Sequence, residues 1–330
     1  MEDVRSVQMT GGSTFTVSLP KDWAERSGIG KGSRIAMSEK EDGSISIYPL
    51  DKRPSDKRQK VISLDDDLSL LSRKVIASYI MGFDSITIRS DRFSSEHRTH
   101  IFNLVEGLMG LEVIREDSQS IEIKQMLDPT QLTIPSALSR LYLLAESMIR
   151  DLPAALSESN RTLLSDIATR ESHVDRIHWF LLRQINYGII DHRFSHSVDL
   201  DIHLATCYLS VARNVERICD HVENVANLML DISKSSSLPN SLVEISNLCS
   251  DIFSRSMRSF LKSDIGMAQE VLIEVDRQIE DYAISTFTDI TRRKKRSHVL
   301  NAMLAAESLH RIISYSQDIA EITVDSVISH

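Results

Sequence analysis

The chain is poor in the residues that interrupt helices and in those that favour β-sheets. Its 330 residues contain 11 glycines and 7 prolines, and only 5% of them are aromatic. This scarcity favours long helices packed through aliphatic side chains over a sandwich or a barrel. With 42% hydrophobic and 26% charged residues, the composition is that of a folded protein and excludes wholesale disorder.

Long apolar segments and paired cysteines are also missing. The apolar stretches are far too short to cross a bilayer, and no apolar segment of a secretory signal is seen near the first residue. The three cysteines, Cys207, Cys219 and Cys249, have no spacing typical of a disulfide framework. We therefore expect a cytoplasmic protein without membrane insertion, whose thiols are reduced and mostly buried.

Charge is distributed unevenly along the chain. The net charge is −9, yet residues 1–60 carry 11 Lys and Arg against 9 Asp and Glu. The remainder is strongly acidic and does not attract the phosphate backbone of a nucleic acid. Any contact with DNA is therefore expected in the N-terminal segment.

Residues 1–50 show the alternation that is typical of short strands. A strand is predicted over 14–19, where apolar and polar residues alternate. A helical segment is predicted over 21–27, and a hairpin with an Asp-Gly turn over 34–48. Residues 51–60 contain five basic residues and a proline, and we interpret them as a linker.

The rest of the chain changes its periodicity once more. Residues 61–126 follow the order βαβαββ, which predicts a small α+β module of roughly ferredoxin-like pattern. Residues 127–330 are helical, with breaks near 151–159, 188–198, 234–239, 262–266 and 292–297. Five breaks predict an all-α bundle of six helices.

The helical part contains an internal repeat. Residues 212–226 align with residues 306–320, with an Arg-Ile pair and a final alanine at the same places. We therefore interpret the six helices as two copies of a three-helix unit, at about 131–234 and 238–328. The two copies are expected to pack together because one copy cannot bury its apolar face alone.

The stretch from Val215 to Ala226 reads V-E-R-I-C-D-H-V-E-N-V-A. It resembles the signature of the PhoU family, the phosphate-uptake regulators built of two three-helix repeats. The resemblance extends over the helix pattern of residues 127–330. It implies a PhoU-like six-helix domain, a role in phosphate homeostasis and a phosphate ABC transporter component as a partner.

Residues 16–32 place a strand, a proline, a short helix and a Gly-Ile pair in one order. This order is similar to that of the AbrB/SpoVT DNA-binding domain, in which two chains complete one swapped-hairpin β-barrel. The resemblance implies that residues 1–50 form half of such a barrel, with a second copy and double-stranded DNA as partners. The combination resembles archaeal PhoU-like regulators that carry their own DNA-binding domain.

Pairs of carboxylates stand four residues apart in the predicted helices. Glu171 and Asp175 share one helix face, as do Glu216 and Asp220. If the two helices lie antiparallel, the four carboxylates converge, which costs stability unless a cation or an arginine neutralises them. Oxygen ligands suit Mg, Mn or Fe. From spacing alone, the alternative is a solvated stripe of charge pairs with the nearby arginines, Arg213 and Arg217.

In the PhoU family such pairs hold multinuclear iron or zinc clusters. The resemblance implies metal ligands in the first repeat at Glu171, Asp175, Glu216, Asp220 and Asn224. The second repeat departs from the pattern, since a histidine and a serine replace the second pair of acids. A weaker site or none is expected there, at Asp276, Glu280, His310 and Asp318. The expected metal is iron or zinc, alternatively manganese or magnesium, or none.

AbrB-like domains contact the groove and backbone of DNA with basic and polar side chains. The resemblance implies this role for seven residues, Arg5, Ser13, Thr14, Lys21, Arg26, Lys31 and Arg34. The excess of positive charge is small in one chain, and a dimer would double it. A pure dimerisation module is the alternative.

Two further groups of residues are weaker signals. Residues 292–296 are five consecutive cations, for which we favour interaction with a helix C-terminus over a docking patch. A second group surrounds a predicted helix start, where capping by the aspartates is favoured over metal binding. Its members are His192, His196, Asp199, Asp201 and His203.

These patterns favour a phosphate-responsive transcriptional regulator that binds DNA through its N-terminal domain and senses phosphate status through a metal-binding bundle. An adaptor that negatively regulates a phosphate ABC transporter without binding DNA is the alternative. A carboxylate-bridged metal enzyme is disfavoured, because a di-iron site needs two Glu-x-x-His pairs and only Glu307 and His310 form one. We therefore do not expect an enzyme.

Overall fold

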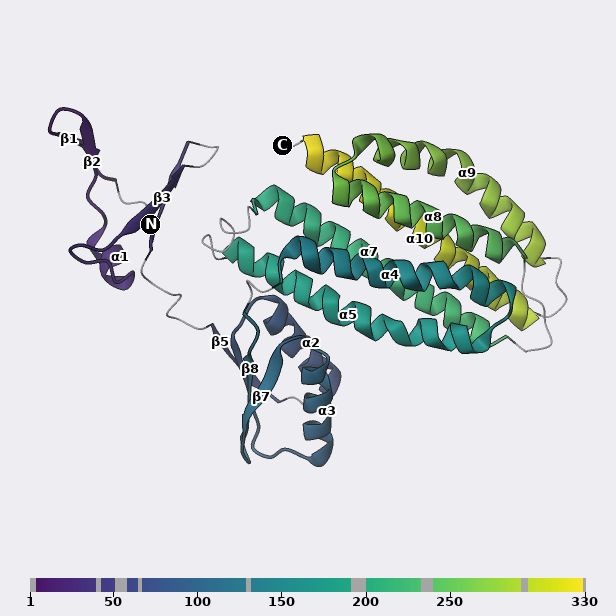
Figure 1. The fold of residues 1–330 in the computed structure, drawn as a ribbon. Coiled ribbons are helices and arrows are strands. Elements are labelled where there is room, and N and C mark those ends of the chain that lie inside the picture. Colours follow the sequence, from purple (N-terminus) through teal and green to yellow (C-terminus); the bar gives the residue numbers. More distant parts are fainter. Residues whose placement is uncertain are drawn as a thin grey trace. The chain divides into compact units, whose positions relative to one another are not determined.

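The computed structural model describes residues 4–39, 43–50, 58–64, 67–128, 132–190, 200–232, 240–291 and 296–328. The chain divides into two compact units, residues 1–57 and residues 58–330. The first unit contains short strands, and the second combines a small sheet with a bundle of long helices (Figure 1). This confirms the multidomain fold class that the sequence predicts.

The N-terminal unit consists of two hairpins and a short helix. Its described elements are β1 (Gln8–Thr10), β2 (Thr14–Thr16), α1 (Lys21–Arg26), β3 (Ile35–Glu39) and β4 (Ile45–Pro49). β1 pairs antiparallel with β2, and β3 with β4. Gly11 and Gly12 close the first hairpin with φ angles of 65° and 80°, which residues with a Cβ rarely adopt.

The predicted helix at 21–27 and the predicted hairpin at 34–48 are present. The strand predicted over 14–19 is wrong in its length, since pairing ends at Thr16. Alternation alone does not make a strand, because a strand also needs a partner, and β1 is long enough to pair only with residues 14–16. β1 itself was not predicted, since three residues are too few to show a period.

The N-terminal unit has no core of its own among its described residues. None of residues 4–39 and 43–50 is buried. Large apolar side chains are open to solvent, with Val4 91%, Phe15 73% and Met9 63% exposed. A two-stranded hairpin is at best marginally stable in water. This unit therefore needs another surface to cover its apolar side chains.

The middle module is a four-stranded sheet whose two helices lie on one face (Figure 1). In chain order it contains β5 (Gln59–Ser63), α2 (Leu68–Ile80), β6 (Ser85–Arg89), α3 (Ser95–Glu106), β7 (Leu111–Glu116) and β8 (Ser120–Gln125). Apolar residues of α2, such as Leu71 and Val75, and of the strands, such as Ile86 and Ile123, form its core.

The strand order of the middle module is β5-β6-β8-β7, with β5 and β6 parallel and the other pairs antiparallel. The predicted order of elements, βαβαββ, is present. The ferredoxin-like expectation is wrong, because that pattern has a split βαβ unit, whereas β5 and β6 are direct neighbours. The last two strands form one hairpin, which adds to the sheet as a unit beside β6.

The C-terminal part of the second unit is a helical bundle. Its described helices are α4 (Ile134–Ser157), α5 (Arg161–Ile190), α7 (Ile202–Leu230), α8 (Asn240–Lys262), α9 (Ile265–Thr291) and α10 (Arg296–Ile328). α7 packs against α5 and α10, and α10 packs against α8 and α9. The two predicted three-helix repeats therefore meet where α7 contacts α10 and where α4 contacts α8, around one continuous apolar core.

Two of the predicted helix breaks are displaced. α4 continues through Pro153 to Ser157, because the buried residues Leu152, Ala155 and Leu156 hold this turn against the core and offset the hydrogen bond that the proline removes. α5 continues past Gly188 to Ile190. The break at 262–266 is present. The breaks at 234–239 and 292–297 lie largely outside the described residues.

Arg183 on α5 joins the bundle to the middle module. Its Nη1 donates to the carbonyl oxygens of Tyr79 at 2.7 Å and Phe83 at 2.9 Å, where α2 ends. Its Nη2 lies 3.8 Å from Oδ1 of Asp84. Arg183 is only 5% exposed, and a buried guanidinium needs such partners. The contact fixes α5 against the end of α2.

No helix in the described part of the chain is both long enough and apolar enough to cross a membrane. The three cysteines are buried and unpaired, as predicted.

Candidate functional site

The first repeat carries an acidic cluster on two helices that pack against each other. Glu171 and Asp175 lie on α5, and Glu216 and Asp220 lie on α7. The negative charges of the other three residues all act on Asp175. Four of the five predicted ligands of this repeat therefore lie close enough to influence one another.

Burial and mutual repulsion change the acidity of this cluster. Desolvation, followed by the charges of its neighbours, raises the pKa of Asp175 to about 7. Desolvation, followed by the charge of Asp220, raises the pKa of Glu216 to about 7. The pKa values of Glu171 and Asp220 are raised by burial and by the charge of Glu223, a fifth acid that is not among the predicted ligands. The cluster thus holds protons near neutral pH.

The two carboxyl groups on α5 share a hydrogen bond. It lowers the pKa of Glu171 and raises that of Asp175, as expected if Asp175 keeps the proton and donates it to Glu171. Two carboxylates that share one proton avoid part of their repulsion.

The arginines of α7 do not form the predicted charge pairs. Arg217 and Arg213 lower the pKa of Glu216 through their charge, but among the described residues neither forms an ion pair with the acidic cluster. The guanidinium of Arg217 instead lies 5.5 Å from the ring centre of Tyr315 on α10.

The geometry of the cluster does not make a formed metal site. Within the described ranges, no group of three His, Cys, Asp or Glu side chains is arranged to hold a metal ion. Asn224, the fifth predicted ligand, donates from Nδ2 to Oγ of Ser308 on α10 at 2.9 Å. The carboxylates have the chemistry that a hard cation prefers, but their positions do not converge on one point. Metal binding stays a prediction.

The predicted residues of the second repeat are dispersed. Asp276 on α9 is exposed and accepts a hydrogen bond from Nε2 of Gln317 at 3.4 Å. His310 and Asp318 lie on α10, where burial lowers the pKa of His310 and raises that of Asp318. The side chain of Glu280 lies outside the described residues.

The contact between the repeats holds a group that the sequence analysis did not select. The rings of His221 on α7 and Tyr315 on α10 stack with their centres 5.8 Å apart. These two residues occupy equivalent positions in the aligned segments 212–226 and 306–320. The alignment of the repeats was the signal that could have found them, because similar units often pack through equivalent residues.

His178 on α5 is a second group that the sequence analysis missed. It is 5% exposed, and its Nδ1 donates to the carbonyl oxygen of Ala212 on α7 at 3.2 Å. Burial lowers its pKa to about 4. It is therefore a neutral residue that ties the two helices of the acidic cluster together.

The seven residues expected to contact DNA lie in the N-terminal unit, and all of them are exposed. Ser13 lies in the turn of the first hairpin, Thr14 begins β2, and Lys21 and Arg26 are the two ends of α1. Arg5 precedes β1, and Lys31 and Arg34 lie between α1 and β3. Lys21 lies 3.8 Å from Glu25 in a pair that solvent surrounds.

The weaker sequence signals are only partly described. Asp201 caps α7 by accepting a hydrogen bond from the backbone of Leu204 at 2.7 Å, which confirms the predicted capping role. Nε2 of His203 lies 3.7 Å from Sγ of Cys207. His192, His196, Asp199 and the cations at 292–295 lie outside the described residues, as does the side chain of Arg296.

Two protein families match this chain. The PhoU domain matches twice, at residues 138–229 and 242–323, which together exceed half of the chain. The family described as "Antidote-toxin recognition MazE, bacterial antitoxin" matches residues 8–55, in the segment where an AbrB-like domain was expected. No curated protein matches.

Solved structures with a similar fold are PhoU proteins. PhoU from Pseudomonas aeruginosa is 20% identical with a TM-score of 0.53, and the alignment covers 60% of this chain and 96% of that one. The phosphate transport system regulatory protein PhoU from Streptococcus pneumoniae is 14% identical with a TM-score of 0.52, covering 60% and 94%. At these identities the likeness shows the fold of the bundle.

Proposed function

This chain belongs to the PhoU family, and we propose that it is a cytoplasmic regulator that couples phosphate status to transcription. The bundle has the fold of proteins named as regulators of phosphate transport. The N-terminal unit matches an antitoxin family, and nothing in the PhoU fold itself requires such a unit. The presence of both in one chain supports a regulator with its own DNA-binding domain and no catalytic role.

The observation that carries this proposal is the absence of buried residues in the described part of the N-terminal unit. Its hairpins present apolar side chains such as Met9 and Phe15 to solvent. A second copy of the same unit would cover these side chains and supply strands to pair with the open edges. We therefore propose a homodimer joined through residues 4–50.

A dimer also strengthens the proposed interaction with DNA. All seven candidate residues are exposed on this unit, so none of them is occupied in a core. Pairing two copies doubles their number, and each cation that contacts a phosphate adds to a salt-dependent affinity. The acidic bundle does not attract the phosphate backbone, which supports our proposal that DNA binds to the N-terminal units.

The test is a gel shift with the full-length protein and genomic DNA fragments that it enriches from its own genome. We expect saturable binding. The logarithm of the association constant should fall linearly with the logarithm of the salt concentration. The double variant Lys21→Glu, Lys31→Glu should bind at least about tenfold more weakly. The matched control, Lys262→Glu with Arg277→Glu in the bundle, should bind like the wild type. No shift at low salt would refute the proposal.

An adaptor of a phosphate transporter is the second candidate, because the matched part of this chain covers nearly the whole length of the PhoU structures. In that case the chain gives no shift with any fragment. It would instead co-purify with the cytoplasmic component of a phosphate ABC transporter, and the charge reversals at Lys21 and Lys31 would leave this association unchanged.

Metal sensing rests on donor chemistry alone, since no three described side chains converge. We keep it as a proposal for Glu171, Asp175, Glu216 and Asp220, which need their charges neutralised. Elemental analysis of the purified chain should find iron or zinc, or else manganese or magnesium, and Asp220→Ala should lower its content. Wild-type protein without metal, or an unchanged metal content in the variant, would refute the proposal of metal sensing.

A further inference from the structure

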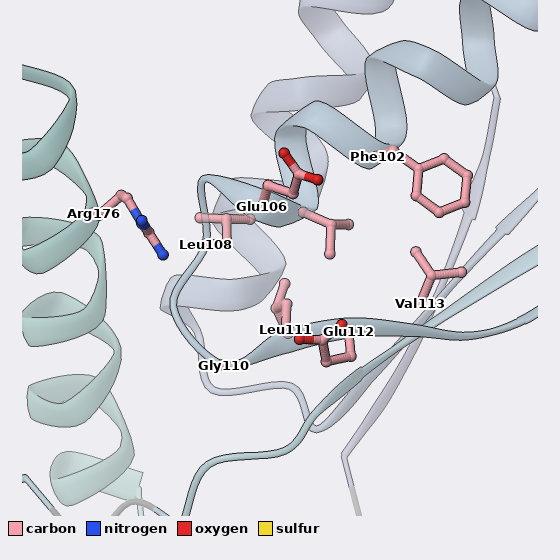
Figure 2. A pocket seen from close by; sticks show the side chains of 9 residues that line it. Phe102, Glu106, Leu108, Gly110, Leu111, Glu112, Val113 and Arg176 are labelled. Carbon is pink, nitrogen blue, oxygen red and sulfur yellow. The ribbon is translucent and has the colours of Figure 1, made fainter. Parts of the chain in front are cut away.

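A cavity of about 460 Å³ lies where the middle module faces helix α5 of the bundle. Figure 2 shows Arg176 reaching from α5 toward α3, β7 and the turn that joins them. A volume of this size is in the range of small-molecule sites. None of the residues singled out in the sequence lines it.

The floor of the cavity is apolar and firmly built. Val105, Leu108 and Leu111 are at most 5% exposed and belong to the core of the module. Gly110, in the turn between α3 and β7, has a φ of 80°, and a Cβ there would meet Gln125 Nε2 at 2.6 Å. A residue with a Cβ would be strained at this position, so the shape of the turn depends on glycine.

One side of the cavity is an open apolar wall. Phe102 on α3 is 38% exposed, and Figure 2 shows its ring beside Val113 of β7. An aromatic ring that is left partly in water offers an apolar ligand a surface to cover. The cavity thus has room for an apolar group of modest size, which Phe102 and Val113 could contact.

Three charged groups stand around this apolar surface. Glu106 and Glu112 come from the module, and Arg176 comes from α5. All three are exposed, and among the described residues none of them forms an ion pair. Two carboxylates on the middle module and one guanidinium on α5 suit a ligand that carries both a cationic and an anionic group.

We propose that this cavity binds a small zwitterion with an apolar body, of the class of apolar amino acids and their dipeptides. The ligand's ammonium group binds Glu106 and Glu112, its carboxylate binds Arg176, and its side chain covers Phe102 and Val113. A simple anion is disfavoured because two carboxylates repel it. An uncharged apolar ligand would make no use of the three charged groups.

Such a ligand would act on the junction between module and bundle. Arg176 directly follows Asp175 of the acidic cluster, and it lies on the same helix as Arg183, which holds α5 to the end of α2. A ligand bound to both Arg176 and Glu112 adds a second link between the two parts. This inference does not depend on DNA binding or on phosphate sensing.

The test is isothermal titration calorimetry of the full-length protein with leucine, phenylalanine, leucyl-leucine and leucyl-phenylalanine. We expect saturable binding of at least one probe, and at least about tenfold weaker binding by Arg176→Gln and by Glu112→Gln. The N-acetylated and amidated forms of the same probe, which lack one charge each, should also bind at least about tenfold more weakly.

Matched controls separate this site from a general effect of charge. Arg277 on α9 and Glu244 on α8 are also exposed, and Arg277→Gln and Glu244→Gln should bind like the wild type. All the changed side chains are exposed, so the variants are expected to fold, and circular dichroism verifies this. The proposal is overturned if no probe binds at about 10 mM, a concentration at which even millimolar affinity is visible. Binding by Arg176→Gln and Glu112→Gln that is as tight as binding by the wild type would overturn it as well.

Discussion

At the scale of single residues, helix α5 carries ionisable groups whose pKa values are shifted in opposite directions by the same cause. Burial removes water from both the acidic cluster and His178. It raises the pKa of Asp175 to about 7 and lowers that of His178 to about 4, because in each case the neutral form is favoured. The two groups therefore make stability depend on pH in opposite directions.

His178 makes the fold sensitive to acid. In the unfolded chain a histidine binds a proton below about pH 6.5, whereas the folded state keeps His178 neutral down to about pH 4. The unfolded state gains protons first, so stability falls as the pH drops through this window, by about 2 kcal/mol between pH 7 and pH 5. His178→Gln, which keeps a donor for Ala212, should remove this loss in urea unfolding.

His173→Gln provides the matched control, because His173 lies on the same helix and is exposed. It should keep the wild-type dependence on pH. If His178→Gln and His173→Gln lost stability equally between pH 7 and pH 5, the buried histidine would not be the cause.

Glu216 makes stability change with pH in the opposite direction to His178. Its folded-state pKa of about 7 exceeds the ordinary value of 4.5, so the folded state holds a proton that the unfolded state has lost. Stability from this group is therefore full at low pH and falls as the pH rises toward and past 7. Glu216→Gln should raise the free energy of unfolding at pH 8 by about 1–2 kcal/mol, after allowance for solvent screening.

The same substitution should change little at pH 5, where the wild-type side chain is already neutral. Glu321→Gln on α10, an exposed position, should have no effect at either pH. Denaturant unfolding at the two pH values measures both variants, and a loss of stability by Glu216→Gln at pH 8 would speak against repulsion in the acidic cluster.

At the scale of elements, local patterns predict much of the fold and little of how its parts pack. Hydrophobic periodicity gives the helices of the bundle, and the four-residue spacing of Glu216 and Asp220 places both acids on one face of α7. Spacing does not show whether side chains converge, which depends on the neighbouring helix. Likewise, Pro153 stays inside α4 because of tertiary packing, and no local pattern indicates that.

Arg183 is an example of a contact that no local pattern reveals. Its partners are the backbone carbonyl groups of Tyr79 and Phe83, which lie 104 and 100 residues earlier in the chain. Backbone atoms at a helix end leave no trace in residue type. The sequence analysis therefore treated the middle module and the bundle as separate parts, whereas the structure joins them.

The contact made by Arg183 should be costly to remove. Arg183→Met keeps most of the volume but removes the side-chain donor of the Phe83 carbonyl. It also removes one of two donors of the Tyr79 carbonyl, which still accepts from the backbone N–H of Gly82. We expect a loss of about 2–4 kcal/mol in the free energy of unfolding. Hydrogen exchange should increase at the C-terminal turn of α2 more than elsewhere in the module. Arg277→Met, at an exposed position of α9, should change neither quantity.

At the scale of the whole molecule, the two units differ in how they are stabilised. Residues 58–330 contain two apolar cores, one in the middle module and one in the bundle. The described residues of the N-terminal unit contain no buried side chain. The sequence suggested this only through a resemblance, because short alternating strands look alike whether they close a core within one chain or between two.

The dimer is the prediction that belongs to this scale. Phe15 is 73% exposed in the middle of β2, so a charge there costs a single chain little but is buried in a dimer. Phe15→Asp should raise the concentration at which the dimer dissociates at least about tenfold, as measured by light scattering over a dilution series. Val61→Asp, an exposed apolar position of β5 in the middle module, is the control and should stay dimeric.

The central claim is that a PhoU-type bundle is joined to a DNA-binding dimer in one regulator. Genome-wide DNA occupancy of the full-length protein, measured in cells at high and at low phosphate, tests this most directly. We predict discrete sites near genes of phosphate uptake, with occupancy that changes between the two conditions and is lost in the Lys21→Glu, Lys31→Glu variant. Occupancy at background level in both conditions, or unchanged sites in that variant, would contradict the claim.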